Sequence, residues 1–273
     1  MNPQTTTTTS NTSSSTISAN IPMVTQVITI DGMGQISQMS ASDFDVVLLS
    51  HEHVQQTALA LALIFSQEEP LAIGTATTPM AYFPYAYGYV KRCAEGGLSH
   101  IAIDKASNMV VGFHLCSDAD QWVEPQSNDE GILLHLRLLD DLHANYEESQ
   151  QHNHYGKGTA SSSGKKIFKI CSAGTYSFAR RVGLAKRMFN EALQLAKEKK
   201  YDSIMVECTG FASQALYAKI GFNEVARVNY EDYEVVDYLP NKATGGNIER
   251  RRRPFKTIPS SVGTFINLMV MDL

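Results

Sequence analysis

The segment from Lys166 to Lys199 constrains the fold most, because it joins a strand to an amphipathic helix through a short turn. Residues 167–171 are apolar and rich in β-branched side chains, which predicts a strand. A turn is expected over residues 172–179. From about Gly183 onward one face repeats at helical spacing, which predicts a helix; its members are Ala185, Met188, Phe189, Ala192, Leu193 and Ala196.

The start of this helix is a candidate anion site. The first N–H groups of a helix have no partner inside it, and they carry the positive end of the helix dipole. Gly183 and Ala185 have no large side chains, so an anion can approach the backbone there. An ordinary strand-to-helix turn is the structural alternative for this glycine and alanine alone.

Two motifs in this region resemble those of the GCN5-related N-acetyltransferases. Arg180-x-x-Gly183-x-Ala185 is similar to the Gln/Arg-x-x-Gly-x-Gly/Ala signature of that superfamily. About 30 residues on, the run from Ser213 to Phe222 resembles its second element, a short helix ending in Leu-Tyr-x-Lys-hydrophobic-Gly-Phe. A predicted strand, Ser203–Cys208, lies between the two motifs, which makes their order and distance more specific than either motif alone.

This resemblance implies a fold and a co-substrate. The implied fold is α+β: a mixed, mostly antiparallel sheet with helices on both faces. In it two neighbouring parallel strands, here Ile167–Cys171 and Ser203–Cys208, splay apart around acetyl-CoA. The residues that the resemblance assigns to cofactor binding are Ile170, Cys171, Ser172, Arg180, Arg181, Val182, Gly183, Leu184, Ala185, Lys186, Ser213 and Tyr217.

A closer resemblance connects the N-terminal half to the invertebrate arylalkylamine N-acetyltransferases. It rests on Phe-x-x-Glu-Glu-Pro-Leu at Phe65–Leu71 and on Gly97-Leu98-Ser99 before a predicted strand. It implies that Glu69 is the general base. Thr209 and Ser213 match two assisting hydroxyls, with threonine standing where serine is usual, and Tyr217 matches the general acid.

Each of these roles has a structural alternative. Glu69 could end a helix, Ser213 could cap one, and Tyr217 could only pack over the cofactor tail. The vertebrate branch of these N-acetyltransferases carries a pair of histidines on the strand before the phosphate loop. The matching residues here, 169–171, include no histidine. Nothing in the sequence supplies an activating base beside Cys171, so a nucleophilic role for it is not expected.

The rest of the chain is expected to form one domain, residues 23–273, after a disordered tail rich in Ser, Thr and Asn at residues 1–22. Residues 144–164 and 240–262 are expected to be loops, the second holding the basic run Arg250–Arg253. That run is expected in solvent, with a nuclear address or a contact to the cofactor's outer phosphate as alternatives. Further predicted strands cover residues 23–30, 44–49, 98–104, 109–116, 224–230 and 265–271, and predicted helices cover 51–66, 80–95 and 131–143.

Composition limits the partners. The net charge of −5 gives no general attraction to nucleic acid. No apolar run is long enough to span a membrane, no secretory signal is recognised, and the four cysteines have no metal-ligand spacing. His152 and His154 lack further ligands, so no metal is expected. A cytoplasmic monomer or homodimer is expected.

The expected activity is direct transfer of acetyl from acetyl-CoA to a small primary amine. The aromatic residues Tyr82, Phe83, Tyr85, Tyr87 and Tyr89 in one predicted helix favour an arylalkylamine, either as a wall for the substrate or as ordinary helix packing. Polyamines, amino acids and other acyl groups stay open. The alternatives are a protein N-terminal or lysine acetyltransferase and a non-catalytic CoA-binding module.

Overall fold

The computed structural model describes residues 39–153, 165–240 and 247–273, with the side chains of residues 150–153 and 240 left out. The tail predicted for residues 1–22 and the strand predicted for residues 23–30 lie outside the described residues.

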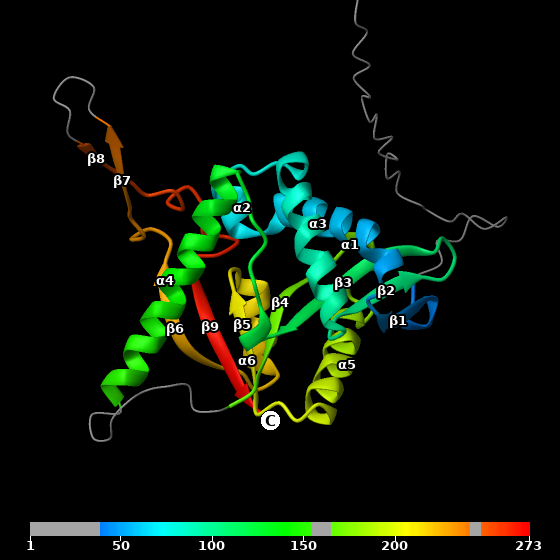
Figure 1. The fold of residues 1–273 in the computed structure, drawn as a ribbon. Coiled ribbons are helices and arrows are strands. Elements are labelled where there is room, and N and C mark those ends of the chain that lie inside the picture. Colours follow the sequence, from blue (N-terminus) through cyan, green and yellow to red (C-terminus); the bar gives the residue numbers. More distant parts are fainter. Residues whose placement is uncertain (1–38, 154–164, 241–246) are drawn as a thin grey trace, which may run out of the picture. The chain divides into compact units, whose positions relative to one another are not determined.

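In the described part of the chain, seven strands form one sheet in the order β1-β2-β3-β4-β5-β9-β6 (Figure 1). Its strands are β1 (Phe44–Leu48), β2 (His100–Asp104), β3 (Met109–Asp118), β4 (Ile167–Thr175), β5 (Ser203–Cys208), β6 (Asn223–Asn229) and β9 (Phe265–Asp272). All neighbouring strands of this sheet are antiparallel except β4 and β5, which are parallel. The mixed, mostly antiparallel sheet predicted from the sequence is therefore confirmed.

Helices cover both faces of the sheet (Figure 1). One face carries α1 (Val54–Glu68), α2 (Pro70–Gly74), α3 (Pro79–Gly96) and α4 (Glu130–Asn153), and the other carries α5 (Leu184–Glu198) and α6 (Phe211–Lys219). Short 3-10 turns cover Ala41–Asp43, His51–His53, Ala119–Gln121 and Ser177–Ala179. Because side chains alternate along a strand, β3 contributes to both layers: Phe113 and Leu115 pack with α1 and α3, and His114 between them packs against Phe189 of α5.

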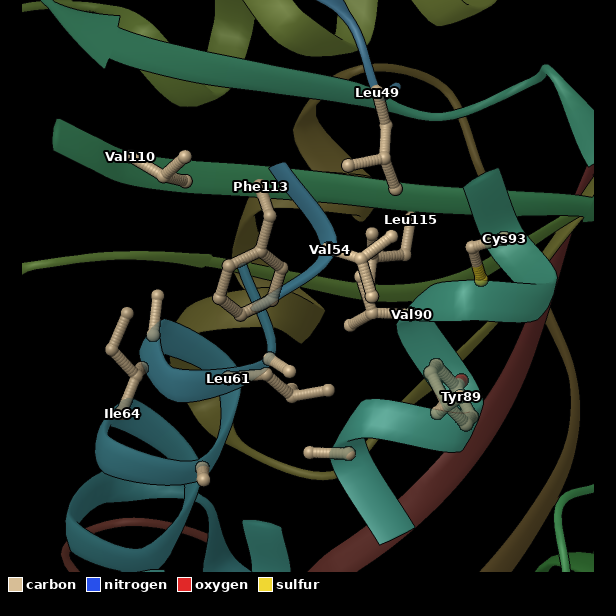
Figure 2. Close-up of a cluster of buried hydrophobic side chains, with 14 of the residues drawn as sticks. Leu49, Val54, Leu61, Ile64, Tyr89, Val90, Cys93, Val110, Phe113 and Leu115 are labelled. Carbon is tan, nitrogen blue, oxygen red and sulfur yellow. The ribbon is translucent and has the colours of Figure 1, made fainter. Parts of the chain in front are cut away.

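The cluster between α1, α3 and the sheet fixes the position of α1 (Figure 2). Leu61 of α1 and Val90 of α3 are buried beside Phe113, and all three are at most 1% exposed. Full burial of such a side chain contributes about 1.5–3 kcal/mol. α1 ends at Glu68, and the Glu68 carboxylate pairs with Arg180 of the loop before α5. The end of α1 is therefore held beside that loop.

The parallel strands β4 and β5 separate within the sheet. They pair from Ile167↔Ser203 to Ile170↔Val206 and no further, whereas β4 stays paired with β3 as far as Thr175. Residues 171–175 of β4 therefore have an edge that β5 does not cover. The structure confirms the splayed pair that the family resemblance implied.

Two predicted loops are wrong in part. α4 runs to Asn153 instead of ending near residue 143, because Glu and Gln favour helix and Tyr146 packs against the core. The loop predicted at 240–262 contains β8 (Asn247–Arg252), which pairs with β7 (Val235–Pro240) in a small separate sheet.

The basic run lies partly in this hairpin. Arg252 pairs with Asp237 of the opposite strand and with Glu130 of α4, and Arg251 pairs with Glu234. Opposite charges on facing strands stabilise such a pair. Sequence reasoning did not identify these acidic partners, since they lie 15 or more residues away in the chain.

Candidate active site

A cavity of about 1090 Å³ lies where β4 and β5 separate. Its walls come from α1, α2, α3 and α4 on one face of the sheet, from α5 and α6 on the other, and from β4 and β5 themselves. Of the site residues predicted from the sequence, all line this cavity except Val182, which packs beside Leu184 and Met188.

The uncovered edge of β4 has polar groups available for a ligand. Ser172 is buried in the cavity wall, and its side-chain hydroxyl has no hydrogen-bond partner among the described residues. Cys171 also lines the cavity, and its carbonyl oxygen accepts a hydrogen bond of 2.8 Å from Tyr89 Oη. The strand therefore presents the unpaired Ser172 hydroxyl to the cavity, whereas the Cys171 carbonyl already accepts one hydrogen bond.

The start of α5 forms a candidate anion cradle. Arg181 has φ +65° and Gly183, the residue before the helix, has φ +86°. Among the described residues, no protein acceptor is recorded for the backbone N–H groups from Val182 to Lys186. Converging amides in such a left-handed turn bind anions, and the helix dipole adds to the attraction.

The side chains of this loop have different surroundings. Arg180 donates from Nε to the Thr175 carbonyl at 2.9 Å and pairs with Glu68, so it ties the loop to the end of β4 and to α1. Leu184 is buried and anchors the helix, whereas Lys186 is exposed at the cavity. A Cβ added at Gly183 would have no atom within 4 Å, so the space beside this turn is open.

Glu69 lies between α1 and α2 and caps α2. Its Oε1 accepts from the Leu71 N–H at 3.0 Å and its Oε2 from the Ala72 N–H at 2.7 Å. Burial raises the pKa of Glu69 above its ordinary value, although the bonds from Leu71, Ala72 and the Thr209 side chain lower it. These three bonds leave about one of the four acceptor sites of the carboxylate for a ligand. Capping and base chemistry are therefore compatible.

The two predicted hydroxyls near α6 differ in their contacts. The Thr209 side chain hydrogen-bonds to Glu69, and the Thr209 carbonyl accepts from Tyr230 Oη at 2.6 Å. Ser213 lines the cavity, but its hydroxyl donates to the Gly210 carbonyl at 2.9 Å. Thr209 is thus placed beside the candidate base, while the hydroxyl of Ser213 binds the backbone of its own helix.

Tyr217 of α6 is buried, 4% exposed, and packs edge-on against Phe189 and Phe222. Burial raises the pKa of its phenol well above the usual value, so Tyr217 carries its proton at neutral pH. Its Oη lies 3.4 Å from Nε2 of His114, a residue of β3 that also lines the cavity. Sequence reasoning missed His114, because nothing in an apolar strand shows which helix its histidine will face.

Tyr82, Tyr85 and Tyr89 of α3 line the cavity, whereas Phe83 and Tyr87 do not. Phe65 and Phe113 lie in the same wall. The aromatic wall predicted from the sequence thus uses three of the five aromatic residues of α3.

Three polar side chains meet between β4, β5 and α4, an arrangement that the sequence did not indicate. Glu207 of β5, which lines the cavity, lies 2.8 Å from Lys169 Nζ and 2.7 Å from His143 Nε2. Burial alone would raise the pKa of Glu207, but Lys169 and His143 hold it at about 2. Glu207 is therefore ionised at neutral pH.

Among the described residues, no group of three or more His, Cys, Asp or Glu side chains could hold a metal ion. No helix in the described ranges combines the length and the apolar character needed to cross a bilayer.

This architecture is similar to that of solved structures, although no similar sequence was found. No protein-family model matches the sequence, and no curated protein matches it significantly. Solved structures do match: arylalkylamine N-acetyltransferase 2 from the mosquito Aedes aegypti has a TM-score of 0.62 at 18% identity, over 84% of this chain and 99% of that one.

Two other solved structures extend the comparison. The C-terminal condensation domain of Ebony, in complex with β-alanyl-dopamine, has a TM-score of 0.61 at 18% identity, over 84% of this chain and 99% of that domain. A polyamine N-acetyltransferase from Drosophila melanogaster, which forms N-acetylagmatine, has a TM-score of 0.57 at 16% identity, over 85% of this chain and all of that one. With its splayed β4–β5 pair and the candidate anion cradle before α5, the chain has the fold of the GCN5-related N-acetyltransferases.

Proposed function

We propose that this protein transfers an acetyl group from acetyl-CoA to a small primary amine, and that the amine is an arylalkylamine such as dopamine, serotonin or tryptamine. A fold alone does not specify chemistry, so the proposal rests on the cavity. The observation that carries it is the continuity of one cavity from the free amides at the start of α5, along the uncovered edge of β4, to Glu69.

The cavity residues fit acetyl-CoA. In the proposed complex the amides of residues 182–186 hold the diphosphate, with Lys186 adding positive charge. The edge of β4, including the unpartnered Ser172 hydroxyl, binds the pantetheine arm. This arrangement extends the thioester end of acetyl-CoA into the cavity that Glu69 and Tyr217 also line.

In the proposed reaction, Glu69 removes a proton from the amine and the neutral nitrogen attacks the acetyl carbon. The raised pKa of Glu69 suits a base better than an ordinary carboxylate would, because it lies nearer to neutral pH. As the carbon–sulfur bond breaks, the electron pair goes to sulfur and Tyr217 gives its proton to that sulfur. The nitrogen loses its second proton to water, which leaves the neutral amide. Transfer is direct, since holding both reactants together supplies much of the rate enhancement.

An arylalkylamine is supported by the tyrosines of α3, whose flat rings suit an aromatic substrate. Two of the similar structures are described with aromatic amines, one as an arylalkylamine N-acetyltransferase and one bound to β-alanyl-dopamine. The polyamine N-acetyltransferase is a reason to include a cationic aliphatic amine in the test. We also place the protein in the cytoplasm, where its four free cysteines would remain reduced.

The test is release of free thiol from acetyl-CoA with tryptamine, dopamine, spermidine or a histone-tail peptide as acceptor. We expect the two aromatic amines to give the highest kcat/KM. Turnover with the peptide alone would overturn the small-amine proposal. CoA binding without thiol release for any acceptor would indicate a non-catalytic binding module.

A further inference from the structure

His114 and Tyr217 come from different parts of the chain and meet at the cavity. His114 is 2% exposed and Tyr217 is 4% exposed, and Nε2 of the histidine lies 3.4 Å from Oη of the tyrosine. The other ring nitrogen, Nδ1, lies 3.2 Å from Sγ of Cys116. Tyr217, His114 and Cys116 thus form a chain of three polar groups that begins at the cavity.

The imidazole of His114 is neutral. Burial, and to a smaller extent His100 on β2, lower the pKa of His114 to about 3. Phe189 of α5 packs edge-on against the ring. Burial lowers the pKa of His100, and the charge of Glu191, on the same helix as Phe189, raises it by less. Among the described residues, only Tyr217 and Cys116 hydrogen-bond to the ring. One ring nitrogen therefore carries a proton and the other accepts one.

The position of that proton decides which way the Tyr217 hydroxyl points. If Nδ1 carries it, Nε2 accepts the Tyr217 O–H, and the phenol proton is turned away from the cavity. If Nε2 carries it, Nε2–H donates to Oη, and the phenol proton is free to face the cavity. Only the second arrangement lets Tyr217 give its proton to a departing sulfur.

Cys116 can support the second arrangement. Burial raises the pKa of the Cys116 thiol well above its usual value, so it keeps its proton. That S–H can donate a hydrogen bond to Nδ1. Nδ1 can accept this bond only when it carries no proton, so the ring proton is then on Nε2. The competing acceptor is the His114 carbonyl oxygen, which lies farther from Sγ, at 3.7 Å.

We propose that His114 is the positioning residue of Tyr217: it donates Nε2–H to Tyr217 Oη and thereby directs the tyrosine O–H toward the cavity. This inference rests on the proposed function. When Tyr217 gives its proton to the sulfur, Oη becomes negatively charged, and the bond from Nε2–H becomes charge-assisted and stronger. After the thiol leaves, Tyr217 takes up a proton from the solvent, which has received the second proton of the amine nitrogen. Because the bond strengthens only as charge develops, His114 supports kcat rather than acetyl-CoA binding.

Three variants of the full chain separate this role from packing. In His114→Gln the side-chain amide can donate from about the position of Nε2, whereas in His114→Asn it lies nearer Nδ1 and Cys116. His114→Phe keeps a ring without a donor. We expect kcat to fall about ten- to hundredfold in the Phe and Asn variants, with the KM for acetyl-CoA little changed, and to be largely kept in the Gln variant. In a Tyr217→Phe background, His114→Phe should lower kcat by less than about twofold.

Nitrogen-15 NMR of the wild-type protein saturated with CoA reports the tautomer of His114 directly, without any substitution in the chain. We expect the His114 signal of the Nε2–H tautomer; the Nδ1–H tautomer in that complex would overturn the inference. So would an unchanged kcat in a folded His114→Phe variant, or a Gln variant as slow as the Phe variant. In those cases thiol release by the wild type would leave the proposed function standing. Absence of thiol release by the wild type with every amine would instead overturn the proposed function, and this inference with it.

Discussion

Lys169 Nζ lies 2.8 Å from Glu207 Oε1, at the point where β4 and β5 stop pairing. The Glu207 side chain is 6% exposed and that of Lys169 is 16% exposed. Although burial alone would lower the pKa of Lys169, the nearby Glu207 carboxylate raises it overall. This pair places one positive and one negative charge beside the gap, so that neither charge is left unpaired.

Substitution Lys169→Met should destabilise the fold. It leaves the Glu207 carboxylate buried with His143 as its remaining partner, and breaking a buried pair from one side costs about 3–5 kcal/mol. Urea unfolding measures the loss. Lys197→Met on the exposed face of α5 is the control and should change stability by less than about 0.5 kcal/mol. A Lys169→Met variant as stable as the control would show that the pair does not hold the two strands.

Substitution Glu69→Gln should lower kcat/KM at least about 100-fold, because an amide cannot remove a proton from the amine. Binding of CoA should be unchanged, and Glu95→Gln, at an exposed position near the end of α3, should behave as the wild type. The raised pKa also predicts that the acid limb of kcat/KM lies above the ordinary glutamate value of 4.5, since the base works only when deprotonated. Turnover that survives Glu69→Gln would remove Glu69 from the mechanism.

Alanine substitutions at two glycines with left-handed backbones distinguish an effect on cofactor binding from an effect of backbone strain. Gly183 has φ +86° before α5 and Gly97 has φ +63° after α3, and a Cβ at either meets no atom within 4 Å. Alanine should cost about 1 kcal/mol of stability at both positions. Isothermal titration should show at least about tenfold weaker CoA binding for Gly183→Ala, because its Cβ and shifted amides disturb the cradle. Equal CoA affinity in the two variants would contradict the cradle.

Stability should fall as the pH drops below 6.5, because two histidines are buried in the neutral form. Burial lowers the pKa of His114 to about 3 and that of His135 to about 4, against 6.5 in the unfolded chain. Between these values the unfolded chain binds more protons than the folded one, so stability rises with pH. At pH 5 each histidine should cost about 2 kcal/mol relative to pH 7.

His135→Gln isolates one of these contributions, since its amide can still bond Thr75, the partner of His135 Nε2 at 2.9 Å. Urea unfolding of this variant at pH 7 and pH 5 should show a loss smaller by about 2 kcal/mol than that of the wild type. The same loss in both proteins would mean that His135 is protonated in the folded state.

Much of the fold could be predicted because its signals are local. The strand Ser203–Cys208 has the predicted bounds, and the helix expected from about Gly183 begins at Leu184. The periodicity of the apolar residues and the positions of small residues specify such elements within a short stretch of sequence. The end of α4 was missed because the polar residues after His143 resemble a loop, and the β7–β8 hairpin was missed because its strands need each other to form.

By itself, the sequence determined the order of the strands and helices other than α2, β7 and β8, the loop before α5, and the candidate site residues that the motifs mark. Tertiary structure alone decided that Thr209 hydrogen-bonds to Glu69, that His114 faces Tyr217, and that Lys169 and His143 both contact Glu207. The physical reason is that periodicity and capping act over a few residues, whereas these contacts join strands and helices that only the assembled sheet brings together.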